Sequence, residues 1–174
     1  APVLERAWAV RAGIGVLGKH GLLIVPGQGS YCLLGEVVTT LELRADELGS
    51  PLAARCGSCV SCLEACPTQA FVAPFVLDPR RCVAYWTIEA DSAPPPELRR
   101  AVGGELFGCD ACQAACPYNG VAPPAADRTR HFEPGPRFGA ASLAELVRLD
   151  AASVLEWVRG SPLRRAGRVG LART

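Results

Sequence analysis

The spacing of the cysteines constrains this chain more than any other feature of its sequence. Residues 56–67 read C-G-S-C-V-S-C-L-E-A-C-P, and residues 109–117 read C-D-A-C-Q-A-A-C-P. Eight of the nine cysteines lie between positions 56 and 116. A disulfide framework does not need fixed two-residue gaps, whereas a metal or cluster site does. The spacing therefore predicts a metal-binding or cluster-binding region in the middle of the chain.

The first run has the C-x2-C-x2-C-x3-C-P pattern in which three cysteines bind one [4Fe–4S] cluster and the fourth binds a second cluster. The second run lacks one cysteine, because Leu106 stands where a full copy would have it. Cys82 is the obvious replacement. If each of these eight cysteines is used once, and the last cysteine of each run binds the other cluster, two ligand sets follow. They are Cys56, Cys59, Cys62 and Cys116 for cluster 1, and Cys66, Cys82, Cys109 and Cys112 for cluster 2.

Two other interpretations of these cysteines stay open at this point. Four-thiolate zinc sites also use C-x2-C pairs, although the first run suits two tetrahedral ions poorly. Structural disulfides are the other alternative. Cys32 is left over, and its place in the apolar run 31–34 favours a buried, inert thiol over a ligand.

The hydrophobic spacing predicts short elements of both kinds. Gly and Pro number 18 and 15 of 174 residues, a surplus that favours turns over long elements. Asp78 is expected to cap a helix with Pro79 at its first position. We expect strands at 22–25 and 30–34, an extended or mixed segment at 35–43, loops at 91–96 and 119–124, and helices at 2–12, 63–66, 78–89, 96–102, 110–116, 143–148, 151–159 and 163–173.

Residues 13–18 read G-I-G-V-L-G, which formally matches the G-x-G-x-x-G dinucleotide fingerprint. That fingerprint requires a strand before it and a helix after it. Here a predicted helix precedes it and the β-like segment 22–25 follows, so NAD or FAD binding is disfavoured. The alternative is a glycine turn that lets the backbone pack closely, against other backbone or against a large flat ligand.

The charge balance excludes a strong global attraction to nucleic acid or membranes, because Lys and Arg number 18, Asp and Glu 17, and the net charge is +1. No apolar run approaches the roughly 20 residues of a membrane span, and no signal peptide opens the chain. Because the chain begins at Ala1 and contains no Met, we expect a processed product or an excised fragment. Four arginines give the tail a basic face, either a solvated surface or a phosphate contact: Arg164, Arg165, Arg168 and Arg173.

Beyond the cysteines, the chain resembles the epoxyqueuosine reductases, which are cobalamin-dependent iron–sulfur enzymes of tRNA modification. The similarity runs in order along almost the whole chain, which a generic ferredoxin match would not do. The matching stretches are A-P-V-L-E-R-A (1–7), R-A-G-I-G-V-L-G-K-H-G-L-L-I (11–24), G-S-Y-C-L-L-G-E (29–36), C-G-S-C-V-S-C-L-E-A-C-P-T-Q-A (56–70), L-D-P-R-R-C-V-A-Y-W-T-I-E (77–89), G-C-D-A-C-Q-A-A-C-P-Y-N (108–119) and G-S-P-L-R-R-A-G (160–167).

This resemblance implies the reduction of epoxyqueuosine to queuosine at the wobble position of tRNA. An external donor would supply electrons, which two [4Fe–4S] clusters would pass to cobalamin, and the cysteine assignment implied is the one given above. The implied partner is a tRNA anticodon loop carrying epoxyqueuosine. The implied contacts are Leu23, Leu34, Ala84, Asp110 and Ala111 for the corrinoid, and Asp91, Arg164 and Arg165 for tRNA.

The fold implied is α+β. Residues 1–50 would be the C-terminal part of an α/β corrinoid-binding domain, 51–125 a ferredoxin-like domain with two [4Fe–4S] clusters, and 126–174 a short helical tail leading to helical repeats. The proton-donating Asp of the family stands just before the segment that matches Ala1, so we expect no catalytic residue in this chain and weak binding of cobalamin by it alone. Cys32 and Trp86 stand where other apolar residues are expected. A cytoplasmic monomer is expected.

Two further functions are alternatives. One is a two-cluster electron-transfer ferredoxin, and the other is the electron-donating part of a corrinoid reductive dehalogenase. The segment R-A-G-I-G-V-L-G-K-H favours a corrinoid enzyme over a carrier. The segment L-D-P-R-R-C followed by T-I-E favours the tRNA enzyme over a dehalogenase.

Overall fold

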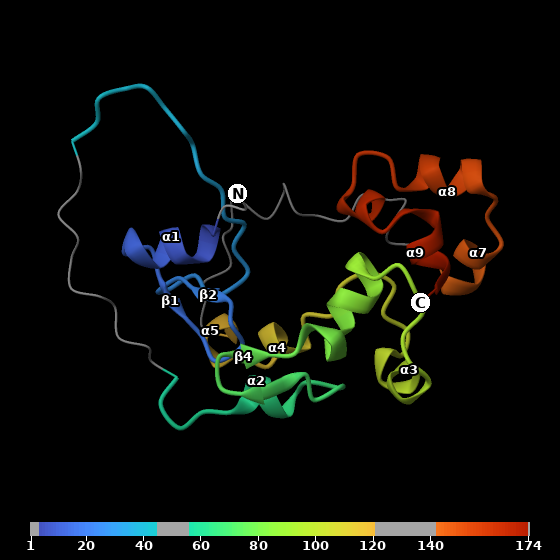
Figure 1. Cartoon of the computed structure of the whole chain (residues 1–174), viewed down its shortest axis with the longest axis horizontal. Helices are drawn as coiled ribbons and strands as arrows, with labels where there is room; N and C mark the ends of the chain where they lie inside the picture. Colours follow the sequence, from blue (N-terminus) through green and yellow to red (C-terminus); the bar gives the residue numbers. More distant parts are fainter. Residues whose placement is uncertain (1–3, 45–55, 121–141, 174) are drawn as a thin grey trace. The chain divides into compact units, whose positions relative to one another are not determined.

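The chain divides into two compact units, and the computed structural model describes residues 4–44, 56–120 and 142–173 (Figure 1). The two units are interleaved along the sequence. In the described residues short helices occur together with two-stranded antiparallel sheets, which confirms the predicted mixed α+β class. The first unit comprises Ala1–Cys66, Phe71–Leu77 and Ala111–Pro123, and the second comprises Pro67–Ala70, Asp78–Asp110 and Pro124–Thr174.

A helix and a small hairpin open the first unit. Helix α1 (Glu5–Arg11) contacts strands β1 (Val16–Leu17) and β2 (Leu23–Ile24), as Figure 1 shows. The strands pair antiparallel, with Val16 opposite Ile24. These elements confirm the helix predicted at 2–12, in shorter form, and the strand predicted at 22–25.

The glycines of residues 13–18 allow the backbone of this hairpin to turn and to pack closely. A Cβ atom on Gly15 would lie 2.4 Å from the carbonyl oxygen of Ile24, so only glycine fits between the strands. A Cβ atom on Gly18 would lie 2.7 Å from Ile24 Cδ1 and from Cε1 of His20. Gly13 has a φ of +71°, in the left-handed region that favours glycine. The interpretation of this motif as a close-packing glycine turn is therefore confirmed.

The strand predicted at 30–34 is wrong. Only a single bridge, Val25 to Gly29, extends the pairing beyond β2, and residues 31–43 form no regular element. The backbone N–H of Ser30 donates instead to the side-chain oxygen of Asn119, at 2.6 Å. Since Leu33 is 89% exposed, the apolar residues of this segment have no neighbouring strand to cover them in the described structure.

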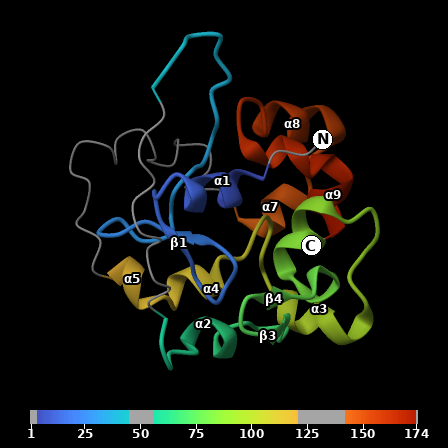
Figure 2. The ribbon, with the colours of Figure 1, turned by 60° about the vertical axis from the view of Figure 1, so that its left-hand side comes forward.

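The rest of the first unit holds the cysteine-bearing helices and a second hairpin. The helix predicted at 63–66 begins and ends two residues earlier, and the one predicted at 110–116 is only four residues long. Helices α2 and α4 contact each other (Figure 2). The predicted loop at 119–124 begins inside a helix and lies outside the described residues from 121 on. The elements are α2 (Ser61–Glu64), β3 (Phe71–Ala73), β4 (Val76–Leu77), α4 (Ala111–Ala114) and α5 (Pro117–Gly120).

In the second unit, the single helix predicted at 78–89 is broken in two. A 3-10 turn, η1 (Pro79–Arg81), is followed by Cys82 in an extended conformation and then by the π-helix η2 (Tyr85–Glu89). The cap predicted at Asp78 is confirmed, because its side chain accepts a hydrogen bond from the backbone N–H of Arg80 at 3.0 Å. The break leaves Cys82 outside both helical turns.

The described part of the second unit contains five more helical segments, and they confirm the helices predicted at 96–102, 143–148 and 151–159. The helix predicted at 163–173 is interrupted where Gly167 takes a φ of +61°. Among the described residues, every helix is too short or too polar to cross a membrane. The segments are α3 (Pro96–Val102), α7 (Leu143–Val147), α8 (Ala151–Trp157), η4 (Pro162–Arg165) and α9 (Gly167–Arg173).

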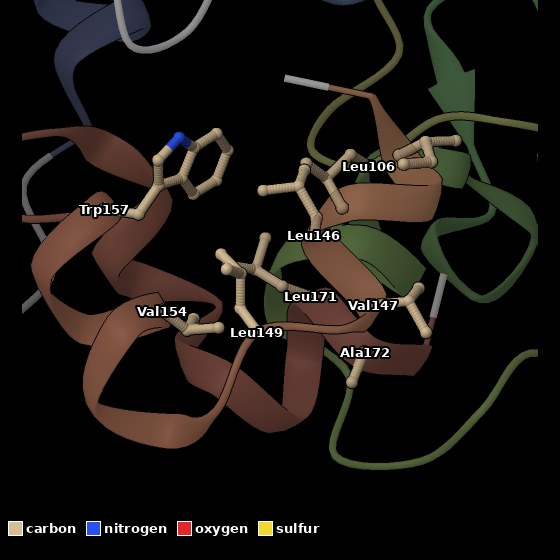
Figure 3. A pocket seen from close by; sticks show the side chains of 9 residues that line it. Leu106, Leu146, Val147, Leu149, Val154, Trp157, Leu171 and Ala172 are labelled. Atoms are coloured by element: carbon tan, nitrogen blue, oxygen red, sulfur yellow. The ribbon is translucent and has the colours of Figure 1, made fainter.

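The tail helices enclose an apolar cavity of about 120 Å³ (Figure 3). Its lining consists of Leu, Val and Ala side chains together with Trp157, contributed by α7, α8 and α9, by Leu149 between α7 and α8, and by Leu106. Because no charged or nucleophilic group lines it, we interpret this cavity as part of the packing between these helices.

Candidate cluster-binding site

Four cysteines line one cavity of about 180 Å³ in the first unit. They are the four predicted for cluster 1: Cys56, Cys59, Cys62 and Cys116. Their partners in the lining are His20, Pro117 and Tyr118. The structure therefore brings this predicted set together around one space, and the role of these residues as ligands stays a prediction.

The local sequence explains how the first three of these cysteines come to face one space. Gly57 has a φ of +47°, which lets the chain turn sharply directly after Cys56. The backbone N–H of Cys59 closes this turn on the carbonyl of Cys56, at 2.9 Å. Helix α2 begins at Ser61 and places Cys62, which is buried, in its first turn.

Lys19, the single lysine of the chain, donates hydrogen bonds to the turn formed by residues 56–59, here called the cysteine turn. Its Nζ donates to the carbonyl of Gly57 at 2.6 Å and to the carbonyl of Cys59 at 2.9 Å. The carbonyl of Lys19 accepts from the backbone N–H of Phe75 at 2.9 Å. The turn between β1 and β2 is thereby connected to the cysteine turn and to the β3–β4 turn.

The thiols differ in their readiness to ionise. The Ser61 hydroxyl, 3.4 Å from the Cys59 sulfur, together with the Ser61 backbone N–H and the charge of Lys19, lowers the pKa of Cys59. Burial, followed by the neighbouring Cys56, raises the pKa of Cys62. Because a cysteine must be deprotonated to bind metal, the surroundings of Cys59 favour metal binding by this thiol more than those of Cys62 do.

The donor set fits an iron–sulfur cluster. Four cysteine sulfurs are the ligands of a [4Fe–4S] cluster, and soft thiolates select iron–sulfur clusters or zinc. Within the described ranges, no three His, Cys, Asp or Glu side chains lie close enough together to hold a single metal ion. The thiols surround a cavity, as the ligands of a larger, polynuclear group must.

The four cysteines predicted for cluster 2 divide between the units. Cys66, after α2, and Cys112, on α4, belong to the first unit. Cys82, between η1 and η2, and Cys109 belong to the second unit. No disulfide joins any two of the nine cysteines, all of which lie in the described residues. Cys32 is half-buried, not buried, and its sulfur lies 3.9 Å from the carbonyl oxygen of Gly29.

A buried threonine fixes the two cysteine segments of the second unit to each other. The Thr87 side chain is completely buried, and its hydroxyl donates to the carbonyl of Val83 at 3.0 Å. The same hydroxyl accepts from the backbone N–H of Gly108 at 2.9 Å. Val83 directly follows Cys82 and Gly108 directly precedes Cys109. Thr87 therefore sets the relative position of two predicted ligands, and sequence analysis missed this role.

We expect Thr87→Val to weaken cluster binding while preserving the shape of the side chain. The variant leaves the half-buried N–H of Gly108 without the Thr87 hydroxyl, which costs about 1–3 kcal/mol of unfolding free energy. In a chain of this size each kcal/mol lowers the melting temperature by about 2–4 °C. Thermal unfolding and the rate of iron loss to a chelator measure the effect in the reconstituted chain. Thr87→Ser keeps the hydroxyl and is the control; equal behaviour of Val and Ser variants would contradict the role.

The residues expected to contact the corrinoid occur in both units. In the first unit Leu23 is buried on β2, Leu34 is half-buried in the irregular segment, and Ala111 is half-buried at the start of α4. In the second unit Ala84 is half-buried beside η2 and Asp110 is exposed. Their contacts with a corrinoid stay predictions.

The residues expected to contact tRNA belong to the second unit and are exposed. Asp91 follows η2, and Arg164 and Arg165 lie on η4. Arg165 forms an ion pair with Glu89 of η2, at 2.8 Å, so its charge is already engaged. Arg164 has no ion pair within the described part of the chain. The side chains of Arg168 and Arg173 lie outside it.

A family model described as "4Fe-4S double cluster binding domain" matches residues 55–119. This range contains both cysteine runs and Cys82. The match supports two iron–sulfur clusters over the zinc and disulfide alternatives. The cysteine region of the chain is thus similar to a domain that binds two [4Fe–4S] clusters.

Longer proteins match nearly the whole chain. It is 46% identical to an epoxyqueuosine reductase of Xanthomonas campestris, with 96% of this chain and 46% of the relative covered. For the epoxyqueuosine reductase of Pseudomonas aeruginosa the identity is 45%, and the match covers 96% of this chain and 45% of the relative. The chain therefore spans less than half the length of these relatives.

Solved structures agree with the sequence matches. Epoxyqueuosine reductase from Bacillus subtilis matches with a TM-score of 0.84 at 33% identity, over 97% of this chain and 44% of its own. A structure of epoxyqueuosine reductase with an epoxyqueuosine-modified tRNA-Tyr stem loop has the same TM-score and identity, with 97% and 43% covered. The resemblance predicted from the sequence is confirmed: this chain is similar to a segment of the epoxyqueuosine reductases over nearly all of its own length.

Proposed function

We propose that this chain is the iron–sulfur segment of an enzyme that reduces epoxyqueuosine to queuosine at the wobble position of tRNA. The observation that carries the proposal is the match to epoxyqueuosine reductases along 96% of the chain, of which the double-cluster region is only a part. A two-cluster electron carrier would account for residues 55–119 alone.

The proposed ligands are those of the two sets given above. Cys56, Cys59, Cys62 and Cys116 would hold cluster 1, and Cys66, Cys82, Cys109 and Cys112 would hold cluster 2. Bound [4Fe–4S] clusters supply one-electron transfer. Around cluster 1 the chain's own contribution is to lower the pKa of Cys59, to fix the turn at Gly57 and to bury Cys62. An external electron donor completes the proposal.

The resemblance alone supports the cobalamin part of the proposal. Its proposed contacts are Leu23, Leu34, Ala84, Asp110 and Ala111. The proposed fold is a corrinoid-binding part at 1–50, a ferredoxin-like two-cluster domain at 51–125 and a helical tail at 126–174. Cobalt in a corrinoid would supply the two-electron chemistry at the epoxide, and no residue of this chain is proposed as the catalytic acid. A cytoplasmic, monomeric enzyme is part of the same proposal.

The tRNA part of the proposal depends on a local patch. The chain has 17 arginines and a single lysine, and arginine suits phosphates and unpaired bases. Since the net charge is only +1, affinity must come from specific contacts and not from a global field. Asp91, Arg164 and Arg165 are all exposed, but Arg165 forms an ion pair with Glu89. Arg164 is therefore the sharper test of the two arginines.

We expect Arg164→Glu, in the longer protein that contains this chain, to weaken binding of an epoxyqueuosine anticodon stem-loop. The plot of log affinity against log salt concentration has a negative slope, and removing one phosphate contact makes it less steep by about 0.7–0.9. Titration of a fluorescent stem-loop at several salt concentrations gives the affinity and the slope together. Both clusters should be retained, as iron analysis will show.

Arg148→Glu is the matched control, because Arg148 is exposed in the same unit and ends α7. It should leave the slope unchanged. Equal salt slopes for the parent and the Arg164→Glu variant would mean that η4 presents only a solvated surface. A parent protein that holds both clusters but never reduces the stem-loop would overturn the proposed function and favour the electron carrier.

A further inference from the structure

A histidine completes the wall of the cysteine-lined cavity. His20 follows Lys19 in the turn between β1 and β2 and is only 5% exposed. Its Nε2 atom is buried and has no hydrogen-bond partner, a condition that no other buried side-chain nitrogen or oxygen shares among the described residues. The residues that line the cavity beside it include the four cysteines predicted for cluster 1.

The other ring nitrogen shows which atom carries the proton. His20 Nδ1 accepts a hydrogen bond from the backbone N–H of Leu22, at 3.1 Å. A neutral imidazole that accepts at Nδ1 carries its proton at Nε2. Burial lowers the pKa of His20, which favours the neutral form of the ring. A single N–H donor is thus left over, on a residue that lines the cavity.

The ring has little freedom to turn away. A Cβ atom on Gly18 would lie 2.7 Å from His20 Cε1 and 3.0 Å from Nε2, so the backbone at Gly18 packs directly against the imidazole. The bond from Leu22 fixes the opposite edge. A buried donor held in one orientation without a partner indicates that the molecule which fills the cavity supplies the acceptor.

We propose that His20 donates its Nε2–H to a sulfur atom of cluster 1 and thereby raises the reduction potential of that cluster. This inference rests on the proposed binding of cluster 1. Reduction adds negative charge to a cluster and its sulfurs, and a hydrogen bond to a charged acceptor is stronger than one to a neutral acceptor. Hydrogen bonds to the sulfurs are among the factors that set cluster potentials. His20 is therefore a positioning and tuning residue, not a ligand.

Three substitutions separate this role from a purely structural one. His20→Phe keeps the size of the ring and removes both nitrogens. His20→Gln keeps an N–H donor at about the distance of Nε2. His20→Asn keeps an acceptor for Leu22, but its amide is too short to replace Nε2. The same change at the chain's other histidine, His131→Phe, is the matched control, and residue 131 lies outside the described residues.

The experiment is an anaerobic redox titration of the reconstituted chain, followed by electron paramagnetic resonance of the reduced clusters. We expect His20→Phe and His20→Asn to lower the equilibrium constant for reduction of one cluster about tenfold, a shift of about 59 mV for one electron. His20→Gln should recover much of the shift, and His131→Phe should show none. Equal potentials in the parent and the Phe variant would overturn the inference.

A second measurement on the unsubstituted chain covers the case in which His20→Phe fails to fold. With ¹⁵N-labelled histidine, the reduced cluster should show a ¹⁵N coupling and an exchangeable proton in pulsed electron paramagnetic resonance. Absence of both signals from a chain that contains both clusters would overturn the role of His20 and leave the proposed function standing. A chain that assembles no [4Fe–4S] cluster at all would instead overturn the proposed function, so the two failures are distinguishable.

Discussion

Anaerobic reconstitution with iron and sulfide is expected to give about eight iron and eight acid-labile sulfide per chain, and Cys82→Ser is expected to hold about half of each. Cys82 lies outside both cysteine runs, yet the second run is one ligand short. The extended backbone at Cys82 interrupts what would otherwise be one helix, and Thr87 ties the next residue to the segment before Cys109. Iron and sulfide analysis, with the absorption spectrum, measures the outcome.

Cys32→Ser is the matched control for this experiment. Cys32 is half-buried and its sulfur has only a distant contact with the carbonyl of Gly29. We expect this variant to keep all of its iron. Cys62→Ser, by contrast, should lose cluster 1 and keep cluster 2. Full iron in Cys82→Ser combined with a loss in Cys32→Ser would show that the ligand assignment is wrong.

Gly15→Ala is expected to be strongly destabilising. The added methyl group would lie 2.4 Å from the carbonyl oxygen of Ile24 and 3.1 Å from Leu23 Cγ, so the β1–β2 pair must open. We expect a loss of at least about 3 kcal/mol in unfolding free energy, at the upper end of overpacking effects. Because Ile24 packs with Cys116 and Cys56 in one core cluster, cluster 1 should become labile as well.

Gly35→Ala controls for the general effect of replacing glycine. A Cβ atom there would meet nothing within 4 Å, and the backbone does not have a positive φ. Its melting temperature and iron content should match those of the parent chain. If Gly15→Ala also matched the parent in both measurements, the close approach of β1 and β2 would not describe the protein in solution.

The sequence predicted the parts of the structure that depend on local spacing. The cysteine runs, the cap at Asp78 and the tail helices follow from residues a few positions apart. The structure bears out the cap and the helices predicted at 143–148 and 151–159, whereas the one predicted at 163–173 is interrupted. The first four-cysteine set depends on Cys116, 54 residues beyond Cys62, and the pattern of the two cysteine runs was enough to suggest it. The structure places those four thiols around one cavity.

The parts that were missed depend on contacts between distant segments. Residues 30–34 have the apolar pattern of a strand. However, the backbone N–H of Ser30 donates to the side-chain oxygen of Asn119, and no strand lies beside residues 30–34 in the described structure. The hairpin β3–β4 was not predicted, because only five residues separate Phe71 from Val76. No role was predicted for Lys19 or His20. A lysine and a histidine between a glycine turn and an apolar strand nevertheless indicate that polar side chains are needed in the β1–β2 turn.

The hydrogen bonds of Lys19 and Asn119 affect whether the cysteine region can fold as a separate module. Residues 55–119 match the double-cluster family, which suggests a piece that could be cut out and moved to another protein. The carbonyls of Gly57 and Cys59, however, are satisfied by Lys19, and Asn119 bonds to Ser30. An excised segment would lose these partners together with one wall of its own cavity. The boundary of the family match is therefore not a boundary of the folded unit. Transfer of the proposed cluster-binding region to another protein would require the β1–β2 hairpin as well.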